Sequence, residues 1–159
     1  MFEFALESAS RRGEIVDLGP QNLYRGKHGE MRIKIARLKG SRDVDIELTP
    51  ELLAACAAMP KEHLRFITSS KGKPIGKKAL GRYFARWCTE AGLPKRCRLH
   101  GLKKNALCNI ILAGGTAPEM MAISGHKDMQ VAQIYIEKIL GHQELADAAI
   151  AKLRTKRAG

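Results

Sequence analysis

The feature of this sequence that most limits its fold is a change in the spacing of its apolar residues. Apolar and polar residues alternate over residues 31–35 and again over 44–48, which is the spacing of a strand with one buried face. Gly40 lies between the two runs and can turn the chain, so together they predict an antiparallel hairpin. Most other apolar residues recur at helical spacing. The sequence therefore predicts a mainly α fold with a small antiparallel β-sheet (α+β).

Capping residues indicate where several of the helices begin. Thr49 and Pro50 have the residue types of an N-cap and a first helical position. Thr116 and Glu119 form a capping box, and Asp128 is suited to cap the next helix. The expected helices cover residues 3–18, 50–59, about 80–91, 102–113, 116–125, the stretch after Asp128 and 143–155. A third strand is expected at residues 64–68.

Charge gives the first indication of a partner. The chain has 159 residues, a length that suits one domain, and its formal net charge is +12. Residues 61–104 hold 13 Lys and Arg residues against two acidic ones, Glu62 and Glu90. An excess confined to one part of the chain predicts an acidic partner, and nucleic acid in particular.

Several classes of protein are excluded by what the sequence lacks. No apolar run approaches the roughly 20 residues of a membrane span, and the N-terminus lacks the basic start and long apolar stretch of a signal peptide. The four cysteines show no paired spacing and are typical of small buried residues in a reducing compartment. Cys97, His100 and Cys108 match no common zinc finger. We therefore expect a cytoplasmic protein without a metal, a cofactor, a membrane partner or a small-molecule substrate.

Three short motifs together suggest chemistry on a phosphodiester. Tyr135 lies nine residues after His126, which itself follows a glycine, and His100 begins a His-Gly-Leu motif. Near the N-terminus, Arg11 stands three residues before Glu14. Attack on a phosphodiester needs a nucleophile placed in line, cations that hold the non-bridging oxygens, and an acid for the leaving oxygen. These motifs supply all three kinds of group.

In order and spacing, these motifs resemble those of the tyrosine recombinases, the phage integrase family, over residues 5–140. The resemblance implies that family's catalytic-core fold. It also implies site-specific recombination or integration of double-stranded DNA by a phage or other mobile element, through a 3′-phosphotyrosine intermediate. No cofactor is needed, because the covalent intermediate keeps the energy of the broken bond.

The resemblance also implies a role for each matching residue. Tyr135 is the nucleophile, and Arg11 clamps the scissile phosphate with its two-pronged guanidinium. Lys39, in the hairpin turn, holds the place of the lysine that protonates the leaving oxygen. His100 is an acid–base or phosphate-binding group, and His126 donates a hydrogen bond to the phosphate or the tyrosine. The implied catalytic set is Arg11, Lys39, His100, Lys103, His126 and Tyr135.

Lys103 departs from the family's pattern, which reads His-x-x-Arg at this motif. Lysine keeps the charge but loses the bidentate fork, and the loss of one oxyanion donor typically slows a reaction about 10²- to 10³-fold. An alternative function is therefore that of a catalytically impaired integrase remnant that only binds DNA. A basic RNA-binding protein is a third possibility, against which stands the small number of aromatic residues for stacking on bases.

The expected domain organisation also follows from the resemblance. Residues 1–159 are expected to form a single catalytic-type domain, with a core over about 1–140 and a helical tail over 141–159. Family members carry further helices and a DNA-clasping domain before this core, and ten residues precede Arg11, so we expect the clasping domain to be absent. Tails of this family often dock on a neighbouring subunit, so self-association on DNA is one expectation. Packing of Leu140, Leu145 and Ile150 on their own domain is the other, and we favour it.

Overall fold

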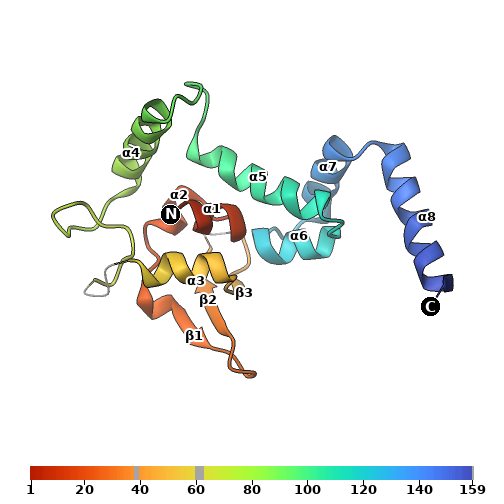
Figure 1. Cartoon of the computed structure of the whole chain (residues 1–159), viewed down its shortest axis with the longest axis horizontal. Coiled ribbons are helices and arrows are strands. Elements are labelled where there is room, and N and C mark those ends of the chain that lie inside the picture. Colours follow the sequence, from red (N-terminus) through yellow and green to blue (C-terminus); the bar gives the residue numbers. More distant parts are fainter. Residues whose placement is uncertain (38–39, 60–62, 159) are drawn as a thin grey trace.

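A computed structural model describes residues 1–37, 40–59 and 63–158, without the side chains of 156–158. Within these ranges the chain is mostly helical and has one small antiparallel sheet, which confirms the fold class predicted from the sequence (Figure 1). In chain order the elements are α1 (Phe2–Glu7), α2 (Arg12–Ile15), the 3-10 turn η1 (Pro20–Asn22), β1 (Leu23–Arg25), β2 (Met31–Ile35), β3 (Val44–Glu47), α3 (Pro50–Ala57), α4 (Lys77–Glu90), α5 (Leu99–Leu112), α6 (Ala117–Ser124), α7 (Met129–Ile139) and α8 (His142–Ala158).

The predicted hairpin is confirmed as β2 and β3, which pair in an antiparallel register that sets Ile35 opposite Val44. The sequence analysis missed β1, a short strand that completes the order β1-β2-β3. Alternation decides which face is buried: Ile33, Ile35 and Val44 are almost fully inaccessible, whereas Lys34 between them is exposed. The sheet thereby has one apolar face turned to the core.

The helix expected over residues 3–18 is instead two short helices, α1 and α2, separated by residues 8–11. Ala9 has a positive φ of 47°, a conformation that cannot continue a right-handed helix. The hydroxyl of Ser8 donates to the carbonyl of Phe4 and also contacts the hydroxyl of Ser10. Such local side-chain hydrogen bonds compete with helical ones, and here they end α1 and let the chain change direction before Arg11.

The predicted strand at residues 64–68 is not formed. The described part of this segment has one isolated bridge, between Thr68 and Pro74, and no strand. Phe66 and Ile67 are nevertheless buried. The apolar run therefore indicated burial correctly, although its backbone is irregular. Short apolar runs carry this ambiguity because burial alone does not fix a backbone conformation.

Two apolar clusters make up the core. The larger one lies among the sheet, α1, α3 and α4, and includes Phe4, Ile33, Leu52 and Leu80. The smaller one joins α5, α6 and α7 through residues such as Leu107 and contains Ala9 from the break after α1. The segment 8–11 therefore lies between the two clusters, which places Arg11 where they meet.

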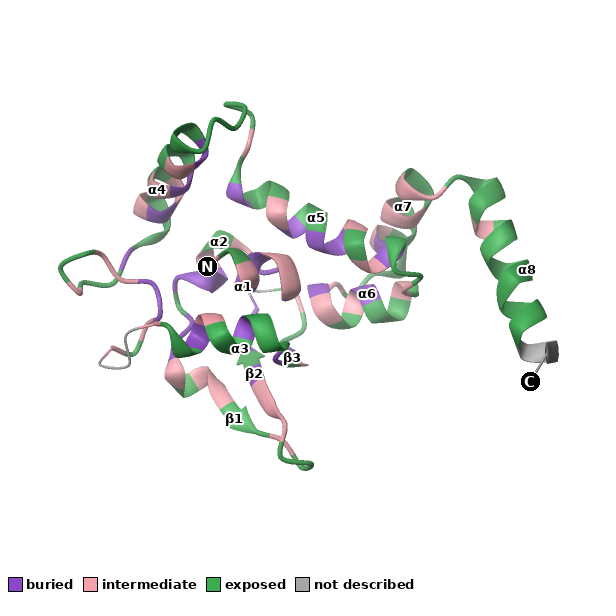
Figure 2. Cartoon of the chain, in the orientation of Figure 1, coloured by how far each residue is buried: buried purple, intermediate pink, exposed green. Residues whose placement is uncertain are grey.

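The last helix, α8, stands away from the body of the molecule and is exposed along almost its whole described length (Figures 1 and 2). Leu140, just before it, packs on the smaller cluster. Ile150 and Leu153 leave 49% and 53% of their surface exposed. The expectation that the tail packs on its own domain is thus correct at Leu140 and wrong at Ile150. No helix of the described ranges is long and apolar enough to cross a membrane.

Candidate phosphate-binding site

Arg11 is held at the start of α2 by the carboxylate of Glu14. The Arg11 backbone N–H donates to Glu14 Oε2 at 2.7 Å, and its Nη1 donates to Oε1 at 3.1 Å. Burial favours the neutral carboxyl, but the Arg11 backbone N–H and the charge of Arg37 outweigh it, so the pKa of Glu14 lies below its usual value. The carboxylate is therefore charged at neutral pH and holds both the backbone N–H and the guanidinium of Arg11, whose side chain keeps 32% of its surface exposed.

Lys103 lies on the buried face of α5, in line with Leu99, Ala106 and Leu107. The residue is 4% exposed. Its Nζ has no hydrogen-bond partner among the described residues. Burial lowers the pKa of the amine to about 8, and the nearby charges of Arg11 and Arg37 contribute. A buried ammonium without an acceptor is unfavourable, so this position is suited to an anion supplied from outside the chain.

His126 follows α6 directly, because Gly125 ends that helix in the left-handed region with φ 72°. The ring nitrogen Nδ1 of His126 is buried and, within the described ranges, unpaired. Burial lowers the pKa of the imidazole, and the charges of Lys103 and Arg11 lower it further. These shared electrostatic effects place Arg11, Lys103 and His126 in one neighbourhood, although they come from three separate segments of the chain.

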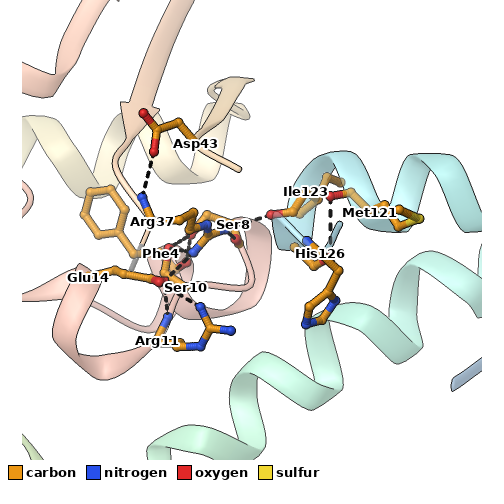
Figure 3. Close-up of polar contacts among 11 residues, drawn as sticks. Phe4, Ser8, Ser10, Arg11, Glu14, Arg37, Asp43, Met121, Ile123 and His126 are labelled. Carbon is orange, nitrogen blue, oxygen red and sulfur yellow. Dashed lines mark hydrogen bonds and ion pairs between the residues drawn. The ribbon is translucent and has the colours of Figure 1, made fainter. Parts of the chain in front are cut away.

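Arg37, which the sequence analysis did not select, lies at the centre of this neighbourhood (Figure 3). Its side chain is completely buried and forms an ion pair with Glu14. A signal for it was present in the sequence. Positions 33, 35 and 37 share one phase of the alternation in β2, so an arginine at 37 follows two buried isoleucines on the inward face. A charged residue at a buried phase predicts a fixed ionic partner.

A basic cleft adjoins Arg11 between α2, α4 and the start of α5. Its volume is about 840 Å³, and its charged or titratable lining residues are Arg11, Arg12, Lys77, Lys78, Arg82, Arg98 and His100. The helices approach closely here: a Cβ at Gly81 would lie 2.6 Å from Nη1 of Arg12. Six fixed cations around one hollow, with no acidic residue in the lining, form an attractive surface for a chain of phosphates.

Two of the remaining predicted residues lie apart from the buried group. His100 is exposed at the rim of the basic cleft, where Arg11 also lies. Tyr135 is half-buried on α7 and packs against the smaller apolar cluster. Lys39 lies outside the described residues. Electrostatic effects thus relate Arg11, Lys103 and His126 to one another, while His100 shares the basic cleft with Arg11 and Tyr135 lies on α7.

The described residues hold no cluster of metal ligands. None of them form a group of three or more His, Cys, Asp or Glu side chains that is able to hold a metal ion. The cysteines Cys56, Cys88, Cys97 and Cys108 are all free. The polar groups of the site include cationic and neutral nitrogens around the buried carboxylate of Glu14. The exposed carboxylate of Asp43 accepts from the backbone N–H of Arg37 at 3.0 Å.

Known structures show the same fold. XerA recombinase matches with a TM-score of 0.69 and 18% identity, over 94% of this chain and 56% of that one. The Tn1549 transposon integrase, in complex with transposon right end DNA, matches with a TM-score of 0.64 and 16% identity, over 97% of this chain and 57% of that one. A lambda integrase dimer bound to a core site matches with a TM-score of 0.68 and 18% identity, over 85% and 40%. The present chain spans little more than half the length of the first two.

The family assignment comes from the sequence itself. No curated protein gives a significant match to the chain. Residues 1–145, however, match the phage integrase family, and this range contains every residue of the predicted catalytic set. The extent of the match and the shared fold lead to one conclusion: the chain belongs to the phage integrase family.

Proposed function

We propose that this chain is the catalytic core of a site-specific DNA recombinase that cleaves and transfers strands through a phosphotyrosine on Tyr135. The observation that carries the proposal is a set of three buried nitrogens without hydrogen-bond partners among the described residues: Lys103 Nζ, His126 Nδ1 and Arg37 Nε. Buried polar groups in native proteins nearly always have partners. Three of them in one electrostatic neighbourhood support a ligand that accepts hydrogen bonds and carries negative charge.

The charge balance of the buried group supports the same ligand. Arg11, Arg37 and Lys103 bring three cations to this neighbourhood, and Glu14 provides one carboxylate. A non-bridging pair of phosphodiester oxygens offsets part of that excess. The transition state of phosphoryl transfer concentrates more charge on those oxygens, so preformed donors favour it over the ground state.

Each residue then has a proposed role. Arg11 and Lys103 hold the non-bridging oxygens, and His126 donates a hydrogen bond to the phosphate or the attacking oxygen. Tyr135 is the nucleophile. It is half-buried on α7 beside the smaller apolar cluster and would attack the phosphorus from there. His100 contacts the backbone from the rim of the cleft, and Lys39 protonates the leaving oxygen as the family resemblance implies.

Double-stranded DNA is the proposed partner because the basic cleft continues from Arg11. Cations from α2, α4 and α5 are available there for the phosphates that flank the one being cleaved. Such contacts fix the position of a duplex without reading its sequence. Self-association on DNA remains part of the proposal, with the exposed α8 available for it.

A second candidate function rests on Lys103 alone. An amine cannot hold two oxygens as a guanidinium can, and its pKa of about 8 means that part of the population is uncharged at mildly alkaline pH. A chain impaired in this way would bind DNA through the basic cleft and cleave it slowly or not at all.

The test uses a pool of labelled, nicked duplexes of randomised sequence, which trap a covalent intermediate when the short strand beyond the nick diffuses away. We expect an adduct that survives denaturation with the wild-type chain and none with Tyr135→Phe, while both proteins retain the same affinity for the pool. Equal binding without any wild-type adduct would support the second function. An adduct that persists in Tyr135→Phe would show that another residue is the nucleophile.

A further inference from the structure

Arg37 joins parts of the chain that are far apart in sequence. From the loop after β2, its Nη1 donates to Ser10 Oγ at 3.1 Å and to the Glu14 carboxylate. Its Nη2 donates to the carbonyl of Ser8 at 2.5 Å and to the carbonyl of Ile123 at 2.7 Å. One guanidinium therefore connects the end of α1, the helix α2 and the end of α6 (Figure 3).

On one side, Arg37 determines how strongly Glu14 holds Arg11. The Glu14 carboxylate accepts hydrogen bonds from both guanidiniums, with Arg11 on Oε1 and Arg37 on Oε2. Because the carboxylate is buried, it requires compensation by positive charge. With Arg37 absent, Arg11 would be the sole remaining donor of charge, and its guanidinium would be drawn inward from the cleft.

On the other side, Arg37 and the hairpin hold in place the segment that carries His126. The carbonyl of Ile123 accepts from Arg37, and the carbonyl of Gly125 accepts from the backbone N–H of Arg42 at 2.9 Å. The fit is close, because a Cβ at Gly125 would lie 2.5 Å from the Arg42 carbonyl oxygen and 3.1 Å from Cγ of Arg37. The position of the imidazole therefore depends on the same side chain that governs Arg11.

We propose that Arg37 is a positioning residue that sets the spacing between Arg11 and His126 around the scissile phosphate. This inference rests on the proposed function. The Arg37 side chain has no exposed surface and lines none of the cavities found among the described residues. Its Nη1 and Nη2 donate to Glu14 and Ile123, whereas its Nε is buried without a partner there. Its hold on Glu14 and Ile123 is therefore what sets the spacing. Displacement of a catalytic group by about 1 Å is enough to slow a reaction about 10²-fold.

The substitution Arg37→Lys tests this role because lysine keeps the charge and can reach Glu14, but cannot also bridge the carbonyls of Ser8 and Ile123. We expect affinity for the nicked duplex pool to change by less than about twofold, whereas adduct formation falls by about tenfold or more. Both are measured well below the unfolding temperature, which circular dichroism determines for each variant. The matched control is Arg65→Lys, in an exposed pair with Asp17 at 2.8 Å, and it should change neither quantity.

A second readout does not depend on cleavage. The chain is 17.6 kDa, a size at which NMR resolves the Nε–H signal of Arg11 and the ring signals of His126. In the free protein, Arg37→Lys should shift both sets of signals, and Arg65→Lys should shift neither. If the wild type forms no adduct, strand cleavage by this chain fails, and the NMR signals alone decide the role of Arg37.

The proposal is overturned if folded Arg37→Lys leaves both sets of signals in place, or if it forms adduct at the wild-type rate. If Arg37→Lys does not fold, Ser10→Ala replaces it, because that change removes one acceptor of Nη1 and leaves the Glu14 pair in place. Ser10→Ala should produce smaller shifts at the same two residues. The absence of any shift at either residue would count against the proposal in the same way.

Discussion

Glu14 and Arg37 form an ion pair in which the two side chains retain 1% and 0% of their exposed surface. A pair of this kind contributes little net stability relative to apolar residues of the same size, yet removal of one member leaves an uncompensated buried charge. Since Glu14 also holds Arg11, the pair makes the geometry of the site depend on the stability of the core.

Glu14→Gln should therefore destabilise the fold by about 3 to 5 kcal/mol, because two guanidiniums lose their common carboxylate. Urea unfolding monitored by circular dichroism measures the change. The control is Asp17→Asn, which breaks the exposed pair with Arg65 and should cost less than about 1 kcal/mol. Equal effects of the two substitutions would contradict the buried character of the Glu14 pair.

The pKa of Glu14 adds a pH dependence to this prediction. Because the folded-state pKa is lower than the unfolded one, the stabilisation is complete above the ordinary carboxyl range and is lost as the pH falls through the folded-state value. The stability difference between wild type and Glu14→Gln should accordingly narrow in acid. A difference that stays constant from neutral pH down to the acid limit of folding would argue against a charged Glu14.

Lys103→Met should stabilise the free protein. Folding lowers the pKa of the Lys103 amine from 10.5 to about 8, which corresponds to about 3 kcal/mol of unfavourable charging at neutral pH. The unfolded chain binds more protons than the folded one between these two values, so wild-type stability rises with pH across that window. The advantage of Lys103→Met should be greatest below pH 8 and shrink above it, as chemical denaturation at several pH values would measure.

Lys103→Arg should speed formation of the covalent adduct, because a guanidinium restores the two-pronged contact with the phosphate. We expect an increase of about 10- to 100-fold, smaller than the full value of an oxyanion donor because the larger side chain must fit a buried position. Lys104→Arg, the exposed neighbour on α5, is the matched control. An unchanged rate in Lys103→Arg would indicate that another part of the site limits the reaction.

The basic cleft should make binding to duplex DNA steeply dependent on salt. Replacing Lys77 and Arg82 together by Gln removes two of its cations and should reduce the slope of log affinity against log salt by about 2 units. The same double change at Lys152 and Arg154 removes equal charge from α8 and should alter the slope less. Equal changes in slope for the two double variants would show that the basic cleft is not the main DNA contact.

Gly125→Ala should destabilise the fold and shift the position of His126. Gly125 and Gly114 both have positive φ, 72° and 82°, so alanine at either position incurs about 1 to 2 kcal/mol of backbone strain. A Cβ at Gly125 also meets the Arg42 carbonyl at 2.5 Å, whereas nothing lies within 4 Å of one at Gly114. Thermal unfolding should therefore show the larger loss for Gly125→Ala, and the ring signals of His126 should move in that variant alone.

The sequence predicted those parts of the fold that depend on local chemistry. Thr49 caps α3 by accepting from the N–H of Leu52 at 3.1 Å, and Thr116 with Glu119 forms the capping box of α6 as expected. The break between α1 and α2 escaped prediction because the apolar spacing of residues 3–18 gives no sign of the positive φ at Ala9. Tertiary packing between the two clusters, and not local preference, determines that conformation.

The candidate site was predicted to a similar degree. The order of motifs singled out Arg11, Lys103 and His126, whose charges act on one another in the structure, while their catalytic roles and that of Tyr135 stay predictions. Arg37 lies outside those motifs, and its signal in the sequence is the alternation in β2. Long-range hydrogen bonds such as the one from Arg37 to Ile123 leave no pattern in a single sequence.

The burial of the Lys103 amine has a consequence for how such genes decay. Lysine and methionine codons can differ by one nucleotide, so a single mutation would remove a charge that the fold tolerates poorly. In a gene copy whose product no longer acts on DNA, that mutation would remove no function and would make the fold more stable. We therefore expect apolar residues at position 103 to be more frequent among relatives that no longer act on DNA.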